Sequence, residues 1–246
     1  MRTLLTLGLL VLSTSSAYAA TAAEVLAKVD KNLGNFKDQV VVFQVQNMKP
    51  GSSTPQSMKF RSYVKAGKNF VEFLEPGDVK GMRILTLGPT EIYTYLPEYG
   101  RIRRVASGNL EQGFLGTTLT QADMATLSYG IVYTPTLTSE TATGYVLDLV
   151  SKDPVNTAYD HLRMEVEKAR SVPTKIDYLA ADGTVVRTQL RSKYSCPRAD
   201  YCTFGELKMI DNSRAGAWTT LVPVDLKIDT GVADDVFSQR TLQLGL

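Results

Sequence analysis

The sequence has little of what a conventional active site requires. It contains one histidine, His161, and two cysteines among 246 residues. It has no Gly-x-Ser-x-Gly motif, no His-Glu-x-x-His motif and no glycine-rich phosphate loop. A hydrolase needs a nucleophile with its base, or a metal with its ligands. We therefore expect a protein that is not an enzyme and uses no cofactor or metal; an enzyme of envelope glycans that relies on His161 or on the scattered acids is the remaining enzymatic alternative.

The sequence also lacks a large charge of either sign. It has 27 Lys and Arg residues against 25 Asp and Glu residues, a formal net charge of +2. A nucleic-acid partner would require many phosphate contacts from basic residues, so the sequence argues against one.

Long apolar runs are absent after the first residues, where a short one occurs. The run Leu4–Leu12 follows Arg2 and precedes the small residues Ala17-Tyr18-Ala19. This three-part pattern predicts a cleaved signal peptide over residues 1–19, because the run is too short to span a bilayer. No cysteine follows the run to carry a lipid anchor, so we expect a soluble exported protein. Residues 20–246 are expected to form one domain.

The two cysteines, Cys196 and Cys202, lie near the ends of one short segment between two strand-like runs. In an oxidising exported setting such a pair predicts a disulfide, which would stabilise the fold by about 2–4 kcal/mol. A metal site is the alternative. It would need two further soft ligands, and His161 is far away in the sequence.

Hydrophobic periodicity predicts one helix followed by many strands. Thr21 and Glu24 fit a capping box, and apolar residues recur at helical spacing from Val25 to Phe36. The clearest strand is Met58–Lys65, in which apolar and basic residues alternate. The further predicted strands are Val40–Met48, Phe70–Leu74, Met82–Leu87, Ile92–Leu96, Gly144–Val150, Leu162–Val166, Thr174–Leu179, Val185–Lys193, Phe204–Ile210, Leu221–Ile228 and Val236–Leu242.

This pattern predicts a mainly β fold in one domain. About ten or eleven strands would leave costly edges in a flat sheet, so we expect an incomplete, strongly curved antiparallel barrel. Asp182-Gly183 lies between two of the strands and predicts a hairpin with a tight type I′ turn.

The stretch from Phe70 to Met124 carries the most distinctive motif of the chain. Its residues read FLEP…G…IL…EIYTYLP…RIRRV…GFLG…D, with the sharpest part between Phe73 and Asp123. In this motif the chain resembles the periplasmic outer-membrane lipoprotein-sorting proteins of the LolA/LolB-like superfamily, in particular their exporter-associated branch. The resemblance covers most of the chain after residue 19.

The resemblance implies a curved sheet with a helix against its concave side and a lid formed by the loop and helix of Phe114–Leu127. It implies a periplasmic carrier that binds acyl chains of a lipid or lipoprotein, receives them from an inner-membrane exporter and contacts membranes transiently. Pattern alone, without the resemblance, favours the other interpretation of each feature: a plain crossover connection for Phe114–Leu127 and a solid core for the apolar inner face. A periplasmic adaptor that binds protein at a sheet edge is the alternative function.

Strand alternation and the resemblance together name the candidate lipid-binding residues. These are Phe43, Val45, Met58, Phe60, Val64, Met82, Ile84, Ile92 and Leu96, with Phe114, Leu115 and Met124 from the cover. A one-residue error in register would exchange the inner and outer faces of a strand. The basic residues Arg101, Arg103 and Arg104 are candidate contacts for a lipid headgroup or a protein partner; exposed arginines that discourage strand pairing at an edge are the alternative.

Overall fold

The computed structural model describes residues 20–88, 90–106, 114–120, 122–123, 128–155 and 157–246. The predicted signal peptide lies outside these residues, as does most of the predicted helix within Phe114–Leu127. Among the described residues, no helix is long and apolar enough to cross a membrane.

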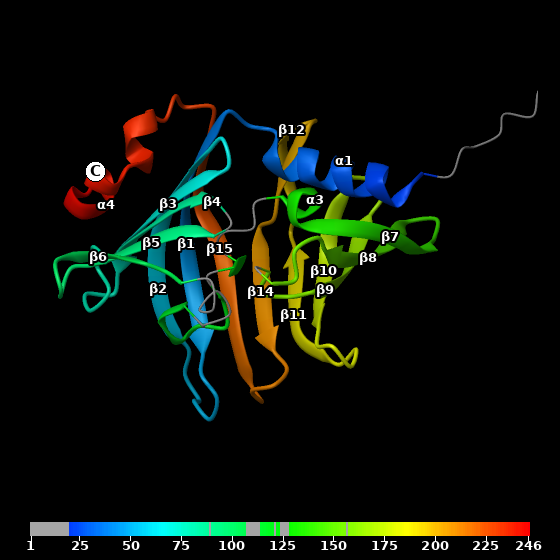
Figure 1. The fold of residues 1–246 in the computed structure, drawn as a ribbon, viewed down its shortest axis with the longest axis horizontal. Helices are drawn as coiled ribbons and strands as arrows, with labels where there is room; N and C mark the ends of the chain where they lie inside the picture. The colour runs from blue at the N-terminus through cyan, green and yellow to red at the C-terminus, as the bar shows by residue number, and fades with distance from the viewer. Residues whose placement is uncertain (1–19, 89, 107–113, 121, 124–127, 156) are drawn as a thin grey trace, which may run out of the picture.

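Thirteen of the described strands form one antiparallel sheet (Figure 1). Their order is β6-β5-β4-β3-β2-β1-β15-β14-β11-β10-β9-β8-β7, so two meanders are joined by β14 and β15. The bounds are β1 Asp38–Met48, β2 Gln56–Lys65, β3 Lys68–Glu75, β4 Arg83–Gly88, β5 Glu91–Leu96, β6 Arg101–Arg104, β7 Tyr133–Glu140, β8 Gly144–Ser151, β9 His161–Glu167, β10 Val172–Leu179, β11 Val185–Ser192, β14 Glu206–Asp211 and β15 Ala217–Ile228. A separate hairpin pairs β12, Ser195–Arg198, with β13, Tyr201–Thr203.

The sheet is curved and open, which confirms the expected incomplete barrel. Strands β6 and β7 stand at the two ends of the strand order and do not pair with each other. The expected number of strands was too low, because the predicted strands do not include β6, β7 and the short strands β12 and β13, whose sequences carry weak apolar alternation. In β7, for example, most residues are Thr, Ser or Glu, and every second side chain is exposed.

The N-terminal helix α1, Ala22–Gly34, begins with the predicted capping box. The Thr21 hydroxyl accepts a bond from the Glu24 amide at 3.3 Å, and the Glu24 carboxylate accepts one from the Thr21 amide at 2.9 Å. The helix buries Val25, Leu26 and Val29 and contacts β7, β10 and β13. It thereby covers one face of the sheet, which we call the inner face.

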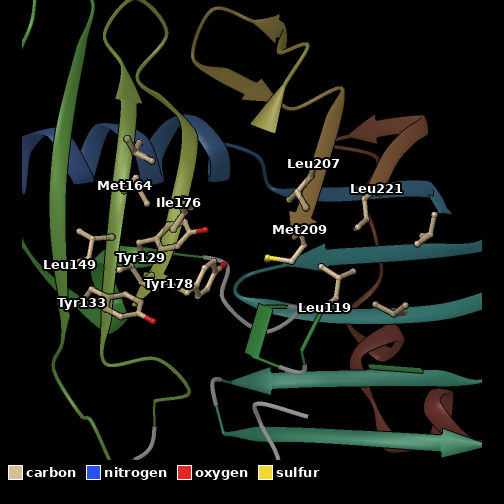
Figure 2. Packing of buried hydrophobic residues seen from close by; sticks show 14 of the residues in the cluster. Leu119, Tyr129, Tyr133, Leu149, Met164, Ile176, Tyr178, Leu207, Met209 and Leu221 are labelled. Carbon is tan, nitrogen blue, oxygen red and sulfur yellow. The ribbon is translucent and has the colours of Figure 1, made fainter. Parts of the chain in front are cut away.

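The main hydrophobic core lies between the inner face and α1. Figure 2 draws part of it, with Leu119 beside Met209 and with Tyr129, Tyr133 and Tyr178 gathered together. Tyr129 begins the short helix α3, Tyr129–Val132, which packs against α1.

A second, smaller core lies on the outer face of the sheet. Phe70 and Leu85 belong to it, whereas Val71, the neighbour of Phe70 on β3, belongs to the main core. Because successive side chains of a strand point to opposite faces, β3 is buried on both sides. The cover is formed by the 3-10 helix η3, Asp234–Phe237, and by α4, Gln239–Leu244.

The prediction of a strand at Val236–Leu242 was therefore wrong. Ser238 accepts a bond from the Thr241 amide at 3.1 Å and starts α4 as its N-cap. Val236, Phe237 and Leu242 are buried at a spacing that fits two short helices rather than a strand.

The predicted hairpin between β10 and β11 is present, but its turn is not type I′. The Gly183 amide bonds to the Ala180 carbonyl at 2.9 Å, and the Ala180 amide bonds to Thr184 at 2.8 Å. A type I′ turn needs positive φ at both central residues, whereas in this loop only Gly183 has one, at 83°. The loop is thus three residues long, with glycine in the left-handed position that such loops require.

Candidate functional site

A cavity of about 750 Å³ lies on the inner face of the sheet. Its walls come from β1 and β2 on one side, from β9, β10 and β11 on the other, and from β14 and β15 between them. The C-terminal half of α1, helix α3 and the β12–β13 hairpin complete the enclosure. The residues of β1 and β2 that line it are Gln39, Val41 and Phe43 with Phe60, Ser62 and Val64, so the cavity occupies one end of these two strands.

One side of the cavity is aromatic. The Phe43 ring lies 5.2 Å from the Phe60 ring and 6.1 Å from the Phe204 ring, measured between centroids. All three residues line the cavity, and Phe60 is only 3% exposed. Such a wall suits an apolar ligand, since it offers area and few polar groups.

The opposite side of the cavity is polar and comes largely from β11. Its alternate residues Arg187, Gln189 and Arg191 face inward, while Leu190 between them is 38% exposed. Gln189 and Arg191 line the cavity directly. Our strand prediction found β11 but gave no weight to these residues. Leu190 is the one apolar residue in the run Arg187-Thr188-Gln189-Leu190-Arg191, so the pattern would have turned Leu190 inward and the arginines into solvent.

Arg187 holds the segment that follows η2, Phe114–Gly116, against the sheet. Its guanidinium makes an ion pair with Asp123 at 2.6 Å and donates to the Thr118 carbonyl. Burial lowers the pKa of Arg187, but attraction by Asp123 and by Tyr159 more than offsets this and raises it. Thr118 also donates from its hydroxyl to the Met209 carbonyl at 3.0 Å. Thr118 and Asp123 are therefore fixed to β11 and β14 by buried polar bonds.

Asp30 fixes α3 to α1. Its carboxylate accepts bonds from the Ser128 hydroxyl and from the amides of Tyr129 and Gly130, at 2.7, 2.9 and 2.7 Å. Glycine at position 130 allows this close approach, because a Cβ there would lie 2.9 Å from the carboxylate oxygen and would displace it. The carboxylate thus satisfies amides at the start of α3 and sets the position of the Tyr129 ring beside the cavity.

The phenols around the cavity remain neutral at physiological pH. Burial raises the pKa of Tyr129 and of Tyr178, and it raises the pKa of Tyr194 to about 12. Tyr178 donates its hydroxyl proton to Asp123 at 3.2 Å. These hydroxyls can form hydrogen bonds with a ligand, but they are poorly suited to act as bases near pH 7.

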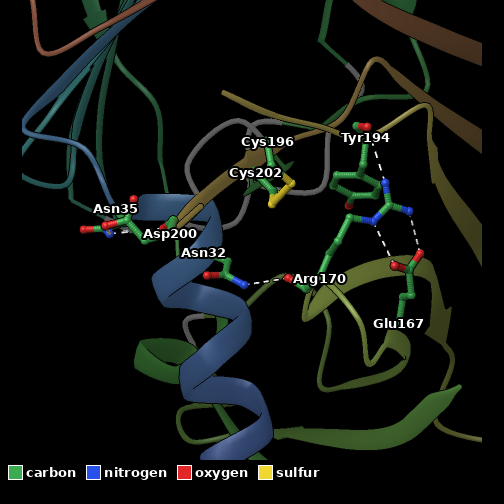
Figure 3. The surroundings of a disulfide bond; sticks show 8 residues. All are labelled: Asn32, Asn35, Glu167, Arg170, Tyr194, Cys196, Asp200 and Cys202. Atoms are coloured by element: carbon green, nitrogen blue, oxygen red, sulfur yellow. Dashed lines mark hydrogen bonds and ion pairs between the residues drawn. A yellow bond between two sulfur atoms is a disulfide. The ribbon is translucent and has the colours of Figure 1, made fainter. Parts of the chain in front are cut away.

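The predicted disulfide between Cys196 and Cys202 is present, with an S–S distance of 2.06 Å. It closes the β12–β13 hairpin, whose residues Tyr201 to Thr203 line the cavity. Figure 3 shows how the end of α1 holds this region: Asn35, its C-cap residue, donates from its side-chain amide to the Asp200 carboxylate at 2.6 Å. The bridge therefore shapes one rim of the cavity.

The structure places the predicted lipid-binding residues in two groups. Phe43, Phe60 and Val64 line the cavity. The others that it describes pack in or against the main core without lining the cavity: Val45, Met58, Met82, Ile84, Ile92, Leu96 and Leu115. Met124 and the side chain of Phe114 lie outside the described part of the chain. A contact of any of these residues with lipid stays a prediction.

The three candidate basic residues lie away from the cavity. Arg101, Arg103 and Arg104 are all exposed on β6, the last strand at one edge of the sheet. Arg103 lies over the Tyr99 ring at 5.1 Å. Their position fits the discouragement of edge pairing at least as well as a contact with a partner.

His161 lies on β9 beside one acid of the neighbouring strand. The imidazole Nε2 lies 3.8 Å from Asp148 on the neighbouring strand, and its side chain is 36% exposed. Within the described ranges, no three His, Cys, Asp or Glu side chains gather in a group that could hold a metal ion.

Comparisons with known proteins agree with this architecture. Residues 65–244 match a family model described as "Uncharacterized protein". A search of curated proteins finds no match. A crystal structure of an outer membrane lipoprotein-sorting protein domain from Vibrio parahaemolyticus is similar, with a TM-score of 0.78, 20% identity, and coverage of 90% of this chain and 98% of that one.

Two further solved structures have the same fold. A LolA superfamily protein from Nitrosomonas europaea gives a TM-score of 0.76 at 20% identity and covers 89% of this chain and 98% of its own. A DUF1329 family protein from Desulfovibrio piger gives 0.81 at 18% identity, with 90% and 97% covered. The fold is that of the LolA superfamily.

Proposed function

The chain belongs to the family whose model spans residues 65–244 and has the LolA fold, and from this premise we propose that it is a periplasmic carrier of acyl chains. It takes up the chains of a lipid or lipoprotein in the cavity, receives them from an inner-membrane exporter and releases them towards the outer membrane. It needs no cofactor and no covalent step. The direction of transfer follows from the relative affinities of successive carriers and membranes.

One observation carries this proposal: part of the inner face of the sheet, beside the packed core, is not filled by the protein's own side chains. The cavity of about 750 Å³ falls in the range of small-molecule binding sites. Each methylene group removed from water contributes about 0.8 kcal/mol, so about ten of them would contribute about 8 kcal/mol before the cost of association. Apolar contact alone is therefore sufficient for useful affinity.

The test is to purify the protein from its own periplasm under native conditions and to measure bound lipid by native mass spectrometry and solvent extraction. The wild type is expected to retain about one acyl-bearing ligand per chain. Phe43→Glu places a charge at the aromatic wall, at a half-buried position where folding can tolerate it, and is expected to abolish retention. Ile92→Glu would be a poor test, because Ile92 is 1% exposed in the core and the variant would unfold.

A matched control comes from β15. Val224→Glu introduces the same charge at a residue that is 56% exposed, and it should retain lipid like the wild type. Circular dichroism and thermal unfolding establish that each variant is folded. A wild-type protein that retains no lipid, and that binds no fluorescent acyl probe when one is added, would refute the carrier.

The same experiment separates the carrier from the alternative, a periplasmic adaptor that binds protein. The open edges of the sheet at β6 and β7 favour that alternative, since an unpaired strand can accept another strand. An adaptor would purify without stoichiometric lipid, and Phe43→Glu would leave its protein binding unchanged.

A further inference from the structure

We infer that the ligand of the cavity has an anionic head, a carboxylate or a phosphate, and that Arg191 binds it. This rests on the proposed function and makes it more specific: the cargo is an acidic amphiphile, with its head at β11 and its chain along the aromatic wall.

Arg191 is held in the wall of the cavity by neighbouring side chains. It lies near the end of β11, faces inward and lines the cavity. Its Nε donates to the Gln189 side-chain oxygen at 2.7 Å, and its Nη2 donates to the Tyr129 hydroxyl at 2.6 Å. Both acceptors are uncharged: the Gln189 side chain is an amide, and burial raises the pKa of Tyr129. Tyr194, whose pKa is also raised by burial, forms a further side-chain hydrogen bond with Arg191. The guanidinium is thus positioned by neutral groups.

Arg191 differs from the other arginines near the cavity in having no acidic partner among the described residues. Elsewhere near the cavity, Arg187 pairs with Asp123 at 2.6 Å and Arg170 pairs with Glu167 at 2.6 Å. Arg191 forms no ion pair with any acid among the residues that the structure describes. A guanidinium remains charged at any physiological pH, and holding it away from water without an anion is costly.

Of the residues that the structure describes, two acids line the same cavity, but each is already bound elsewhere. Asp123 is held by Arg187, and Asp30 accepts bonds from Ser128 and from two amides at the start of α3. Neither is therefore placed to neutralise Arg191. A ligand carboxylate or phosphate would supply the missing charge and accept the remaining guanidinium protons, which suit its planar fork.

The aromatic wall of the cavity begins beside Arg191. The guanidinium carbon lies 5.9 Å from the centroid of the Phe204 ring, which stacks 6.1 Å from Phe43. Phe43 in turn lies 5.2 Å from Phe60. A charged head at Arg191 therefore continues into a path of three aromatic rings, which is the arrangement that an acyl chain with one acidic end requires.

The experiment compares three probes that share one fluorescent C18 polyene chain: the fatty acid, the primary alcohol and the alcohol's monophosphate ester. Each is titrated into delipidated full-length protein at pH 8, where both acidic heads are ionised. We expect the wild type to bind at least one acidic probe roughly 10-fold to 100-fold more tightly than the alcohol, the usual value of a hydrogen bond to a charged group. A preference for the carboxylate points to a fatty acid as the source, and a preference for the phosphate points to a lipid with a phosphomonoester head.

Arg191→Gln is expected to remove this preference and to leave the affinity for the alcohol within about 2-fold. Arg191→Lys keeps the charge and should retain part of the preference. Arg163→Gln, at an exposed position on β9, is the matched control and should behave like the wild type. Should Arg191→Gln fail to fold, the ratio of acid to alcohol in the wild type, measured at low and high salt, still decides.

The outcomes are distinguishable. Equal affinity of the wild type for all three probes, or equal weakening of all three by Arg191→Gln in a folded protein, overturns the anionic head and leaves the carrier standing. If none of the probes binds, the carrier itself fails, and this inference fails with it.

Discussion

The buried ion pair between Arg187 and Asp123 offers the sharpest test of how the inner face is built. The Arg187 residue is 6% exposed, the Asp123 side chain is 5% exposed, and their charged atoms lie 2.6 Å apart. Asp123 also accepts bonds from the amide and the hydroxyl of Thr120, at 2.7 and 2.9 Å. The pair is therefore largely shielded from water, at the margin of the cavity, and joins β11 to the segment over the sheet.

We predict that Arg187→Gln destabilises the protein by about 3–5 kcal/mol, because it leaves the carboxylate of Asp123 buried without its partner. For a domain of this size, that loss lowers the melting temperature by roughly 6–20 °C. Asp123→Asn is expected to cost a similar amount, since it isolates the guanidinium. The double variant should cost less than the sum of the two, by about 1–3 kcal/mol, because both charges are then gone.

The assay is urea unfolding followed by circular dichroism for the wild type, both single variants and the double variant. Arg163→Gln is the control, because Arg163 pairs with Asp148 at 3.1 Å but its side chain is 47% exposed. Removing such a surface pair should cost less than about 1 kcal/mol. If Arg187→Gln costs no more than Arg163→Gln, or if the two single losses simply add, then water reaches the pair and the reasoning is wrong.

Three further predictions follow from other parts of the fold. Asp38 is 3% exposed; its burial opposes ionisation, but hydrogen bonds from Thr230 and Gly231 outweigh this and lower its pKa. Its contribution to stability is therefore present above about pH 4 and is lost as the pH falls further. Asp38→Asn should accordingly reduce the fall in stability at acid pH, measured by urea unfolding. Replacing Cys196 and Cys202 by serine opens a bridge between residues six apart and should cost about 2 kcal/mol in the same assay, with no loss if the hairpin is held by α1 alone. Leu242→Ala should cost roughly 2–5 kcal/mol, as Leu242 is fully buried, and equal melting of variant and wild type would show that α4 does not cover the outer core.

Much of the fold was predictable because local patterns carried it. The Thr21 and Glu24 capping box placed the start of α1, and alternation located Met58–Lys65 within the observed β2. The open, curved sheet followed from the number of strands alone. Where alternation was interrupted by tertiary packing, the prediction failed: Val236–Leu242 has the apolar content of a strand but forms two short helices, because their buried residues cover Phe70 and Leu85.

The candidate site was predictable only in part, because alternation gives the face of a strand and not the position along it. Val45 and Met58 share the inner face with Phe43 and Phe60, yet they are packed in the core, two residues further along β1 and β2. The cavity therefore ends within these strands. Its limit depends on where distant elements such as α1 and the disulfide hairpin lie, and no local pattern encodes that.

The polar residues of β11, which the sequence did not predict as part of the site, say the most about the ligand. An ordinary strand would turn Leu190 inward and Arg191 outward, but here Leu190 is 38% exposed and Arg191 lines the cavity. Turning a leucine outward and an arginine inward loses apolar burial and holds a charge away from water. Such an arrangement is expected only where the inward-facing arginines have partners. Arg187 has its partner in Asp123 within the chain. Arg191 has no acid among the described residues, and the partner that completes the arrangement is therefore to be sought in the cargo.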